Sequence, residues 1–384
     1  MGEPMFRLLT TTGESVGGRI KALAPTGAVT LVANTGQERV IPFDSVVKLT
    51  REEGRRSGPP EAALLLFPDG DHLDRASIGA ASDTHVDVQS YSLGSISVPL
   101  DSLIGLIFSV PTNLEEIHAG LSRVRDDQRT TEVLWLANND RLSIGLLGFS
   151  EKTIEYQAEK RKQSIERTRV VALGFDPKLV TYPRPETGFY ELTLTDGSRI
   201  GVSIIGWEKG TLHAKTRFGV TLKVPALEIS RLRGRSTSIE YLTDRTPARE
   251  VDVPYIGPAR SMRRDLSVDG LPIRLGGEEF DRGLGTMSRT LLAYRLAPGD
   301  LRFQAQVGVN ERAGPQGNAQ FRVMVDGQEK FASPKMASGD PPSTVDLDLE
   351  GAKLLILITE YGDRGGVRDL ADWAEARIIR RANP

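Results

Sequence analysis

The stretch FDRGLGTMSRT, residues 280–290, contains Gly283 and Gly285, followed by residues with hydroxyl side chains. Glycine-rich turns can place backbone N–H groups around a phosphate. Nucleotide-binding loops need a third glycine or a Lys-Ser/Thr pair, and a helix must follow them. The stretch has neither a third glycine nor a Lys-Ser/Thr pair. The residues after it predict a strand and not a helix. We interpret the stretch as a tight turn entering a strand, which glycine backbone angles permit.

The other residues capable of chemistry form no recognised catalytic pattern. The sequence has no cysteine, no Gly-x-Ser-x-Gly and no His-Glu-x-x-His, so thiol and common hydrolase mechanisms have no candidate residues. Glycoside hydrolysis needs two carboxylates across a cleft, and no pair stands out among 51 acidic residues. The acids near His72 are interpreted as turn formers. We therefore predict that the protein is not an enzyme; an enzyme with an unrecognised site is the least favoured alternative.

Composition and charge restrict the partners. A formal net charge of −2 creates no field that would attract nucleic acid or an anionic membrane, and glutamates interrupt the basic run at 159–169. No apolar run has the length of a membrane helix. The first ten residues lack the features of a signal peptide, so an extracytoplasmic protein, as the resemblance described below implies, would be one whose leader is absent from this chain. The 39 glycines and 22 prolines favour an all-β fold rich in turns.

The first 236 residues contain four segments with one pattern of short alternating strands, tight turns and a final apolar strand. Pro42, Pro99, Thr168 and Pro225 take corresponding places, with separations of 57, 69 and 57 residues, which suggests two pairs of segments. The pattern resembles Sm-like (SH3-like) small β-barrels. The predicted repeats are 5–56, 61–111, 131–184 and 188–236. Their edge strands are candidate surfaces for a homo-oligomer or filament.

A helix is predicted between repeats 2 and 3, within the linker 112–127. Thr112 and Glu115 have the spacing of a capping box, and an amphipathic pattern covers 113–126. Its expected buried face consists of Leu114, Ile117, Leu121 and Val124.

From residue 239 to 384 the chain predicts a two-sheet antiparallel sandwich. The ordered stretches YLTD, RDLSVDGLPIRLGGEEFDRGLGTMSRTLLAYRL, FQAQVGVNE and GDRGGVRDLADWAEARI resemble the NPCBM domain, a carbohydrate-binding module of galactose-binding-like jelly-roll fold. The resemblance implies a fold of this type, seen beside glycoside hydrolases and in bacterial, planctomycete-type exported proteins. It also implies glycan binding.

Candidate carbohydrate-binding residues are transferred from this resemblance. Sugar-binding members often carry histidine where this chain has Met287, which weakens the implied sugar binding. The candidates are Arg282, Met287, Asn310, Glu311, Asp363, Arg364 and Trp373. Asp369 and Asp372 are candidates for a calcium loop, or organise their loop without an ion while Trp373 occupies the core. No other cofactor is expected.

The sequence thus predicts a non-catalytic, exported glycan-binding protein in which four barrel repeats space or display a sandwich. The alternative is a structural, self-assembling envelope or extracellular protein whose sandwich no longer binds sugar. Met287 and the tandem repeats favour that alternative, while the extent of the NPCBM resemblance favours the first.

Overall fold

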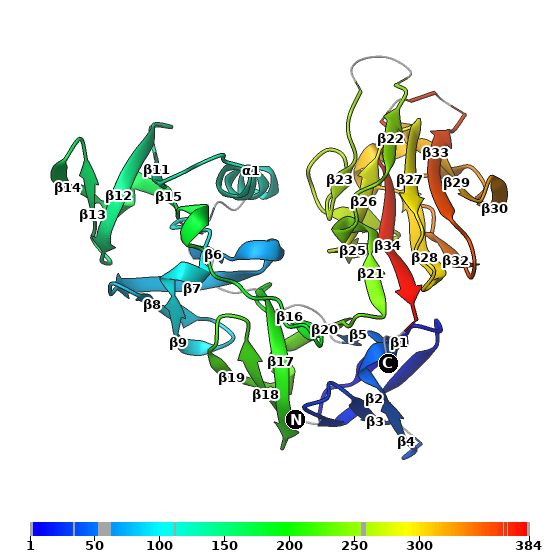
Figure 1. Ribbon diagram of the computed structural model, residues 1–384, viewed down its shortest axis with the longest axis horizontal. Helices are drawn as coiled ribbons and strands as arrows, with labels where there is room; N and C mark the ends of the chain where they lie inside the picture. Colours follow the sequence, from blue (N-terminus) through cyan, green and yellow to red (C-terminus); the bar gives the residue numbers. More distant parts are fainter. Residues whose placement is uncertain are drawn as a thin grey trace. The chain divides into compact units, whose positions relative to one another are not determined.

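The computed structural model describes residues 3–33, 35–52, 63–110, 113–254, 259–363, 365–366 and 368–381. The chain divides into two compact units, Met1–Ser236 and Thr237–Pro384 (Figure 1). Strands dominate both units, which confirms the predicted all-β class. Within the described residues, no helix is long and apolar enough to cross a membrane.

The first unit is built from four successive five-strand segments. The first contains β1 (Phe6–Thr10), β2 (Ser15–Leu23), β3 (Val29–Val32), β4 (Glu38–Ile41) and β5 (Val46–Arg51). The second contains β6 (Ala63–Leu66), β7 (His72–Ala81), β8 (His85–Ser90), β9 (Gly94–Pro99) and β10 (Gly105–Ile107). The third contains β11 (Glu132–Leu136), β12 (Arg141–Phe149), β13 (Thr153–Ala158), β14 (Arg161–Glu166) and β15 (Val170–Gly174). The fourth contains β16 (Phe189–Leu194), β17 (Arg199–Glu208), β18 (Thr211–Thr216), β19 (Thr221–Pro225) and β20 (Ile229–Arg235).

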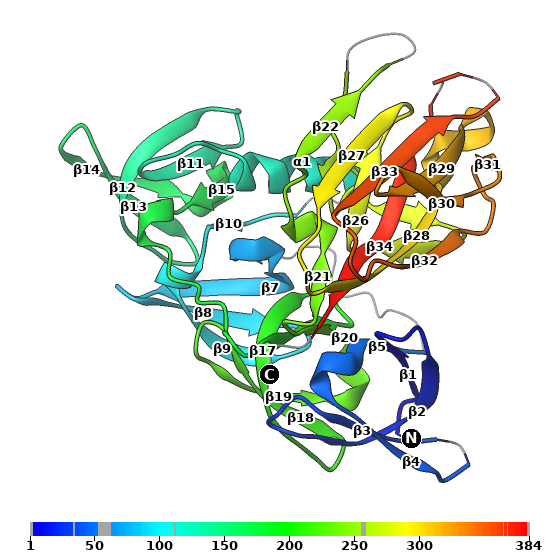
Figure 2. The same ribbon diagram turned by 45° about the vertical axis from the view of Figure 1, so that its right-hand side comes forward.

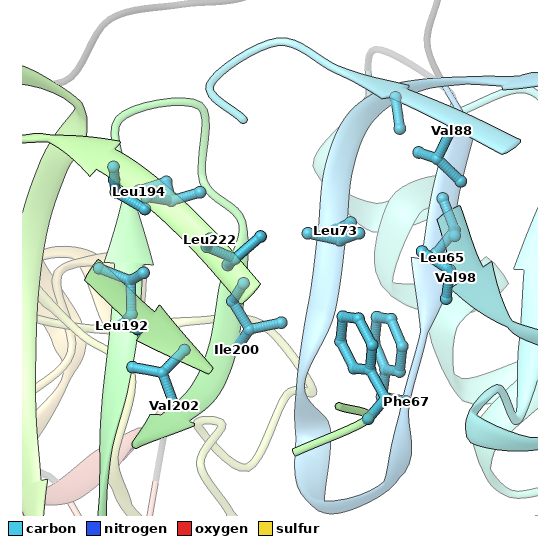
Figure 3. Close-up of a cluster of buried hydrophobic side chains, with 14 of the residues drawn as sticks. Leu65, Phe67, Leu73, Val88, Val98, Leu192, Leu194, Ile200, Val202 and Leu222 are labelled. Atoms are coloured by element: carbon cyan, nitrogen blue, oxygen red, sulfur yellow. The ribbon is translucent and has the colours of Figure 1, made fainter. Parts of the chain in front are cut away.

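The pairing order is the same in each segment. The first four strands pair antiparallel in succession, and the fifth strand pairs back with the first. Alternate side chains point inward, as in β8, where Val86 and Val88 are buried between exposed neighbours. Figure 3 shows two such interiors, one with Leu65 and Val88 and one with Leu192 and Leu222. Apolar alternation in the sequence therefore becomes an apolar interior in every segment.

Two junctions between segments use the fifth strands, and β7 also pairs with β17 at His72 and Arg199, which joins the second segment to the fourth. β5 pairs with β20, joining the first segment to the fourth, and β10 pairs with β15, joining the second to the third. The spacing in the sequence suggested two pairs of segments, and the strand pairings join the first segment to the fourth and the second to the third. The spacing used Thr168, but Glu166 precedes the 3-10 turn Arg167–Arg169 and takes the place that Pro42 has before Phe43–Ser45.

A helix lies between β10 and β11 as predicted. α1 (Leu114–Arg125) begins after Asn113, whose side-chain Oδ1 accepts a hydrogen bond from the backbone N–H of Glu115 at 2.8 Å. Asn113 is thus the N-cap; Thr112 lies outside the described residues. Val124 is buried and Leu121 is half-buried, so the predicted apolar face does contact the sheet.

Glycines permit the close approach of strands at both junctions. A Cβ on Gly234 would lie 2.2 Å from the backbone oxygen of Val46, and a Cβ on Gly105 would lie 2.7 Å from that of Leu173. These contacts are with partner backbone, which cannot rotate away as a side chain would. The sequence pattern predicts strands at both places but does not reveal this requirement.

We expect Gly234→Ala to lower the free energy of unfolding of the first unit by about 1–3 kcal/mol, because β5 and β20 must separate to admit the methyl group. Urea unfolding measures this change. The matched control is Gly206→Ala in the same segment, where a Cβ would meet nothing within 4 Å. Equal stability of the two variants would contradict the close approach of β20 to β5.

The second unit is a two-sheet sandwich with a small hairpin. One sheet contains β21 (Ile239–Tyr241), β23 (Arg263–Arg264), β26 (Gly283–Thr286), β28 (Asp300–Val309), β32 (Ser343–Asp348) and β34 (Ala371–Arg380). The other contains β22 (Arg249–Asp252), β27 (Thr290–Arg295), β29 (Asn318–Val325), β30 (Gln328–Ala332), β31 (Met336–Ala337) and β33 (Leu354–Tyr361). The hairpin consists of β24 (Ile273–Leu275) and β25 (Glu278–Phe280).

Figure 2 shows the strands of the two sheets. The core side chains of this unit lie between these sheets. Phe321 from β29 and Trp373 from β34 meet edge to face, with their ring centroids 5.3 Å apart. The predicted C-terminal sandwich is therefore confirmed.

Candidate functional site

Loops from both sheets meet at one end of the sandwich, here called the loop end. β34 lies between β26 and β28, and Ala371 is in register with Thr286 on one side and with Val309 on the other. Met287 directly follows β26, and Asn310 directly follows β28. Both therefore lie at the edge of the sheet where the loop before β34 ends. The other sheet contributes the end of β33 and the start of β29, where Ala319 pairs with Tyr361.

Asn310 is fully buried and organises this end from within. Its amide nitrogen donates to Asp372 Oδ2 at 2.7 Å, and its side-chain oxygen accepts from the backbone N–H of Arg312 at 3.2 Å. The second bond caps the 3-10 turn Glu311–Gln316. The prediction of Asn310 as a sugar contact is wrong for this reason, since its amide is fully engaged in the protein interior.

Asp369 and Asp372 are both fully buried. Asp369 accepts hydrogen bonds from the Ser288 hydroxyl and, at 3.0 Å, from the backbone N–H of Asn318. Burial raises the pKa of Asp369, and it raises the pKa of Asp372 to about 7, although the hydrogen bond from Asn310 opposes part of the latter shift. These contacts favour the interpretation in which the aspartates organise the loop; among the described residues, no group of three His, Asp or Glu could hold a metal ion.

Trp373 is fully buried, which confirms the alternative in which it occupies the core and removes it from the candidate carbohydrate-binding residues. Its indole nitrogen donates to Thr359 Oγ1 at 3.1 Å across the core, and its ring packs on Phe321. The alternation that places Asp372 on one face of β34 places the indole on the face toward the other sheet. Its role is to hold the two sheets together.

Arg282, another predicted carbohydrate-binding residue, also lies elsewhere in the structure. It precedes β26, whereas Met287 follows it, so the strand separates the two residues. Arg282 is 5% exposed, and its guanidinium nitrogen lies 2.9 Å from Asp265 Oδ2 and 3.7 Å from Asp244 Oδ1. Arg282 is thus a structural ion-pair residue away from the loop end.

Three of the remaining candidates, Met287, Glu311 and Asp363, are at the loop end and partly accessible. Met287 is half-buried against the core, so only part of its side chain faces solvent. Glu311 accepts a hydrogen bond from the backbone N–H of Gly277 at 2.5 Å, and Asp363 is exposed and bound by Lys335. Arg364 lies outside the described residues.

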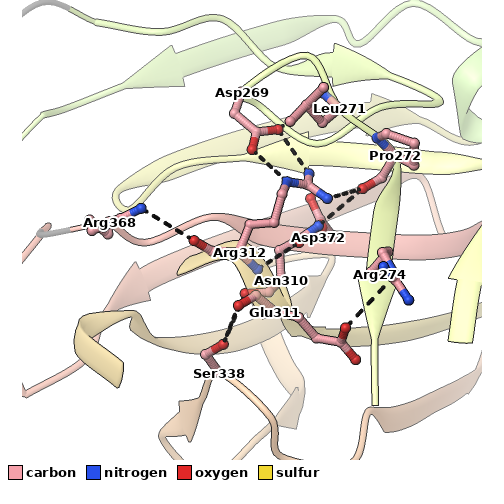
Figure 4. A network of polar contacts seen from close by, with 10 residues as sticks. All are labelled: Asp269, Leu271, Pro272, Arg274, Asn310, Glu311, Arg312, Ser338, Arg368 and Asp372. Atoms are coloured by element: carbon pink, nitrogen blue, oxygen red, sulfur yellow. Dashed lines mark hydrogen bonds and ion pairs between the residues drawn. The ribbon is translucent and has the colours of Figure 1, made fainter. Parts of the chain in front are cut away.

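The structure adds a polar network that the sequence did not indicate (Figure 4). Arg312 binds both carboxylate oxygens of Asp269, at 2.9 and 3.0 Å, and donates to the Pro272 carbonyl at 2.9 Å. Arg274 Nε lies 3.8 Å from Glu311 Oε2. This network fixes the turn after β28 against the segment before β24. Residues 269 and 312 are far apart in the sequence, so no local pattern could reveal the pair.

Tyr361 is the aromatic residue at the loop end that the sequence analysis missed. It ends β33, its side chain is partly exposed, and its hydroxyl donates to the Val253 carbonyl. Burial raises the pKa of this phenol, while the charge of Arg289 opposes the shift. Arg289 Nε in turn lies 3.2 Å from Glu360 Oε2. A partly exposed ring beside a cation and carboxylates combines an apolar face with hydrogen-bonding groups.

Comparison with known proteins assigns the second unit. Residues 240–379 match the NPCBM/NEW2 domain family. A protein of Renibacterium salmoninarum named "Putative endo-alpha-N-acetylgalactosaminidase" is 30% identical over 111 residues, 29% of this chain. The matched stretch is 7% of the length of that protein.

Two solved structures from Clostridium perfringens are similar. The first is CBM51 from GH95 in complex with methyl-galactose, at 23% identity and a TM-score of 0.34, covering 37% of this chain and 99% of that one. The second is CBM51-2 in complex with GlcNAc and INT domains from ZmpB, at 24% identity and a TM-score of 0.35, covering 48% of this chain and 42% of that one. The family match extends from β21 almost to the end of β34. The C-terminal unit of this chain therefore matches the NPCBM/NEW2 domain over almost its whole length.

Proposed function

We propose that the protein is a non-catalytic glycan-binding protein and that the loop end of the sandwich contacts the sugar. The observation that carries the proposal is the match of residues 240–379 to the NPCBM/NEW2 family, which spans both sheets. The loop end supports it, because partly exposed polar side chains there surround a framework held by Asn310, Asp369 and Asp372. Such preorganisation lowers the entropy lost on binding.

Tyr361 is proposed as the residue that packs against the sugar, in place of the buried Trp373. A sugar ring has an apolar face that an aromatic ring can cover, while Arg289 and Glu360 beside it can hydrogen-bond hydroxyl groups. Met287 borders this region from the turn before β27. Methionine forms only weak hydrogen bonds, so the charged groups around Met287 would determine the specificity for the sugar.

We expect Tyr361→Ala to weaken glycan binding at least about tenfold, which corresponds to about 1.4 kcal/mol. Calorimetry with galactosides and N-acetylhexosaminides, the sugar types named for the similar modules, measures the affinity after a glycan array has selected ligands. The matched control is Tyr91→Ala, which removes a tyrosine that is 48% exposed in the first unit. No binding by the intact chain across a broad array would overturn the proposal.

Self-assembly is the second candidate function. Among the described residues, β4, β9, β14 and β19 each pair with one neighbour only, and Val40 on β4 is 70% exposed. Open edges of this kind can pair between copies of a chain. Light scattering over a wide concentration range tests this function. A particle mass that grows with concentration, and grows less in the Val40→Lys protein, supports assembly. A constant monomer mass contradicts it.

The same proposal assigns a role and a compartment to the rest of the chain. The five-strand segments would act as a spacer that displays the sandwich, and the protein would work outside the cytoplasm, where polysaccharides are accessible. The absence of cysteine from the chain is compatible with either compartment. Fractionation of producing cells followed by immunodetection tests the location.

A further inference from the structure

The first unit contains an open hollow of about 590 Å³ that is separate from the proposed glycan site. This volume lies within the range of small-molecule sites. The side chains that matter below come from the turns flanking β8 and β9 and from the turn after β18; they are Asp83, Thr84, His85, Asp101, Arg217 and Phe218.

The floor of the hollow is rigid. The Arg217 side chain is 2% exposed, and its guanidinium lies 4.1 Å over the Tyr182 ring. It also donates to the Tyr182 and Pro183 carbonyls, at 3.1 and 2.9 Å. The Phe218 ring stacks on Phe67, with centroids 4.9 Å apart. An apolar ring is thus held in place before any ligand arrives.

The rim carries two carboxylates, from the turn before β8 and the 3-10 turn after β9. His85 is in register with Pro99, and the backbone N–H of Leu100 donates to the Thr84 carbonyl at 2.9 Å. Asp83 and Asp101 follow this paired end on opposite sides, and both are exposed. Two exposed carboxylates that border one hollow favour a cation placed within it.

The remaining charges leave the hollow acidic. Arg217 contributes one positive charge, but its Nη2 lies 2.8 Å from Asp69, which already compensates it. His85 faces the hollow beside Thr84, whose hydroxyl is 2.9 Å from the imidazole Nδ1, so these groups provide directional hydrogen bonding. Anionic ligands are disfavoured by this arrangement.

We propose that this hollow is a second binding site, which accepts a small molecule with a primary ammonium group on a compact body that has one apolar face. The ammonium would lie between Asp83 and Asp101, and the apolar face would pack on the Phe218 side of the floor. An amino sugar and an amine of amino-acid size share this chemistry.

The test uses the full chain with D-glucosamine and Nα-acetyl-L-lysine amide, followed by saturation-transfer NMR and calorimetry. Each amine is compared with its N-acetylated counterpart, which keeps the body and removes the charge. We expect binding of at least one amine and a loss of about tenfold or more on acetylation, as for a hydrogen bond to a charged group. The double variant Asp83→Asn/Asp101→Asn is expected to lose binding to a similar extent.

Asp87→Asn is the matched control, because Asp87 is an exposed carboxylate on β8 outside the hollow. Tyr361→Ala separates this site from the sandwich, since amine binding should survive that variant. The proposal is overturned if neither amine binds at about 10 mM, or if the double variant binds as tightly as the Asp87→Asn protein. Either result would leave the glycan-binding proposal intact.

Discussion

Replacing Asp372 with asparagine is expected to stabilise the sandwich at pH 8 and to remove much of its pH dependence between pH 4 and pH 7. Burial raises the pKa of Asp372 from 3.8 to about 7 in the folded chain. A carboxyl group with a raised folded pKa stabilises the fold fully below its unfolded pKa and loses that contribution as the pH rises through its folded pKa. A shift of about three units corresponds to roughly 4 kcal/mol at most.

Hydrogen exchange of the β34 amides, measured from pH 4.5 to pH 8, reports on this sandwich specifically and can be combined with urea unfolding. An asparagine can still accept the hydrogen bond that Asn310 donates, so the fold should persist. Asp363→Asn is the control, because that carboxylate side chain is 66% exposed in the loop before β34. Parallel pH profiles for the wild type and Asp372→Asn would refute the role assigned to burial.

Truncating Trp373 to alanine is expected to lower the free energy of unfolding of the sandwich by about 3–5 kcal/mol. The indole is fully buried between the sheets, where it packs on Phe321 and donates to Thr359. Its removal leaves a cavity between β34 and β29 and takes away the indole hydrogen bond to the Thr359 hydroxyl, which keeps its contact with the Thr286 hydroxyl. Denaturant unfolding followed by circular dichroism measures this loss.

Trp373→Phe separates a structural role from a sugar contact. Phenylalanine preserves most of the buried volume, so the variant should fold with a smaller loss of stability. Trp373 is inaccessible to a ligand. The dissociation constant of the Trp373→Phe protein for any glycan that the wild type binds should therefore stay the same within about twofold. A folded Trp373→Phe protein with strongly weakened binding would contradict the buried position.

The stretch 280–290 illustrates how far local sequence reasoning extends. It favoured a turn into a strand over a phosphate loop; in the structure Gly283 and Gly285 lie within β26 itself, and the turn after Thr286 leads into β27, which begins at Thr290. The reason for glycine at 285 was not predictable, because a Cβ there would lie 2.4 Å from the backbone oxygen of Leu266 and thus collide with a neighbouring segment. Pattern and turn chemistry are local, whereas close packing is not.

Strands, turns, the helix and the family of the second unit were accessible from the sequence. Their signals are alternation, capping residues and ordered motifs, all of which lie within short stretches of chain. Asn113 replaced Thr112 as the observed cap without changing the element. The repeating pattern likewise predicted similar strand arrangements in the first 236 residues.

The partners of those elements required the folded chain. The junctions of β5 with β20 and of β10 with β15 depend on which edges remain unpaired once each segment has folded, and several segments offer similar edges. The burial of Trp373, Asn310 and Arg282 depends on which sheet covers them. Residue type and spacing set what a side chain can do, but long-range packing sets which groups surround it and whether a ligand can reach it.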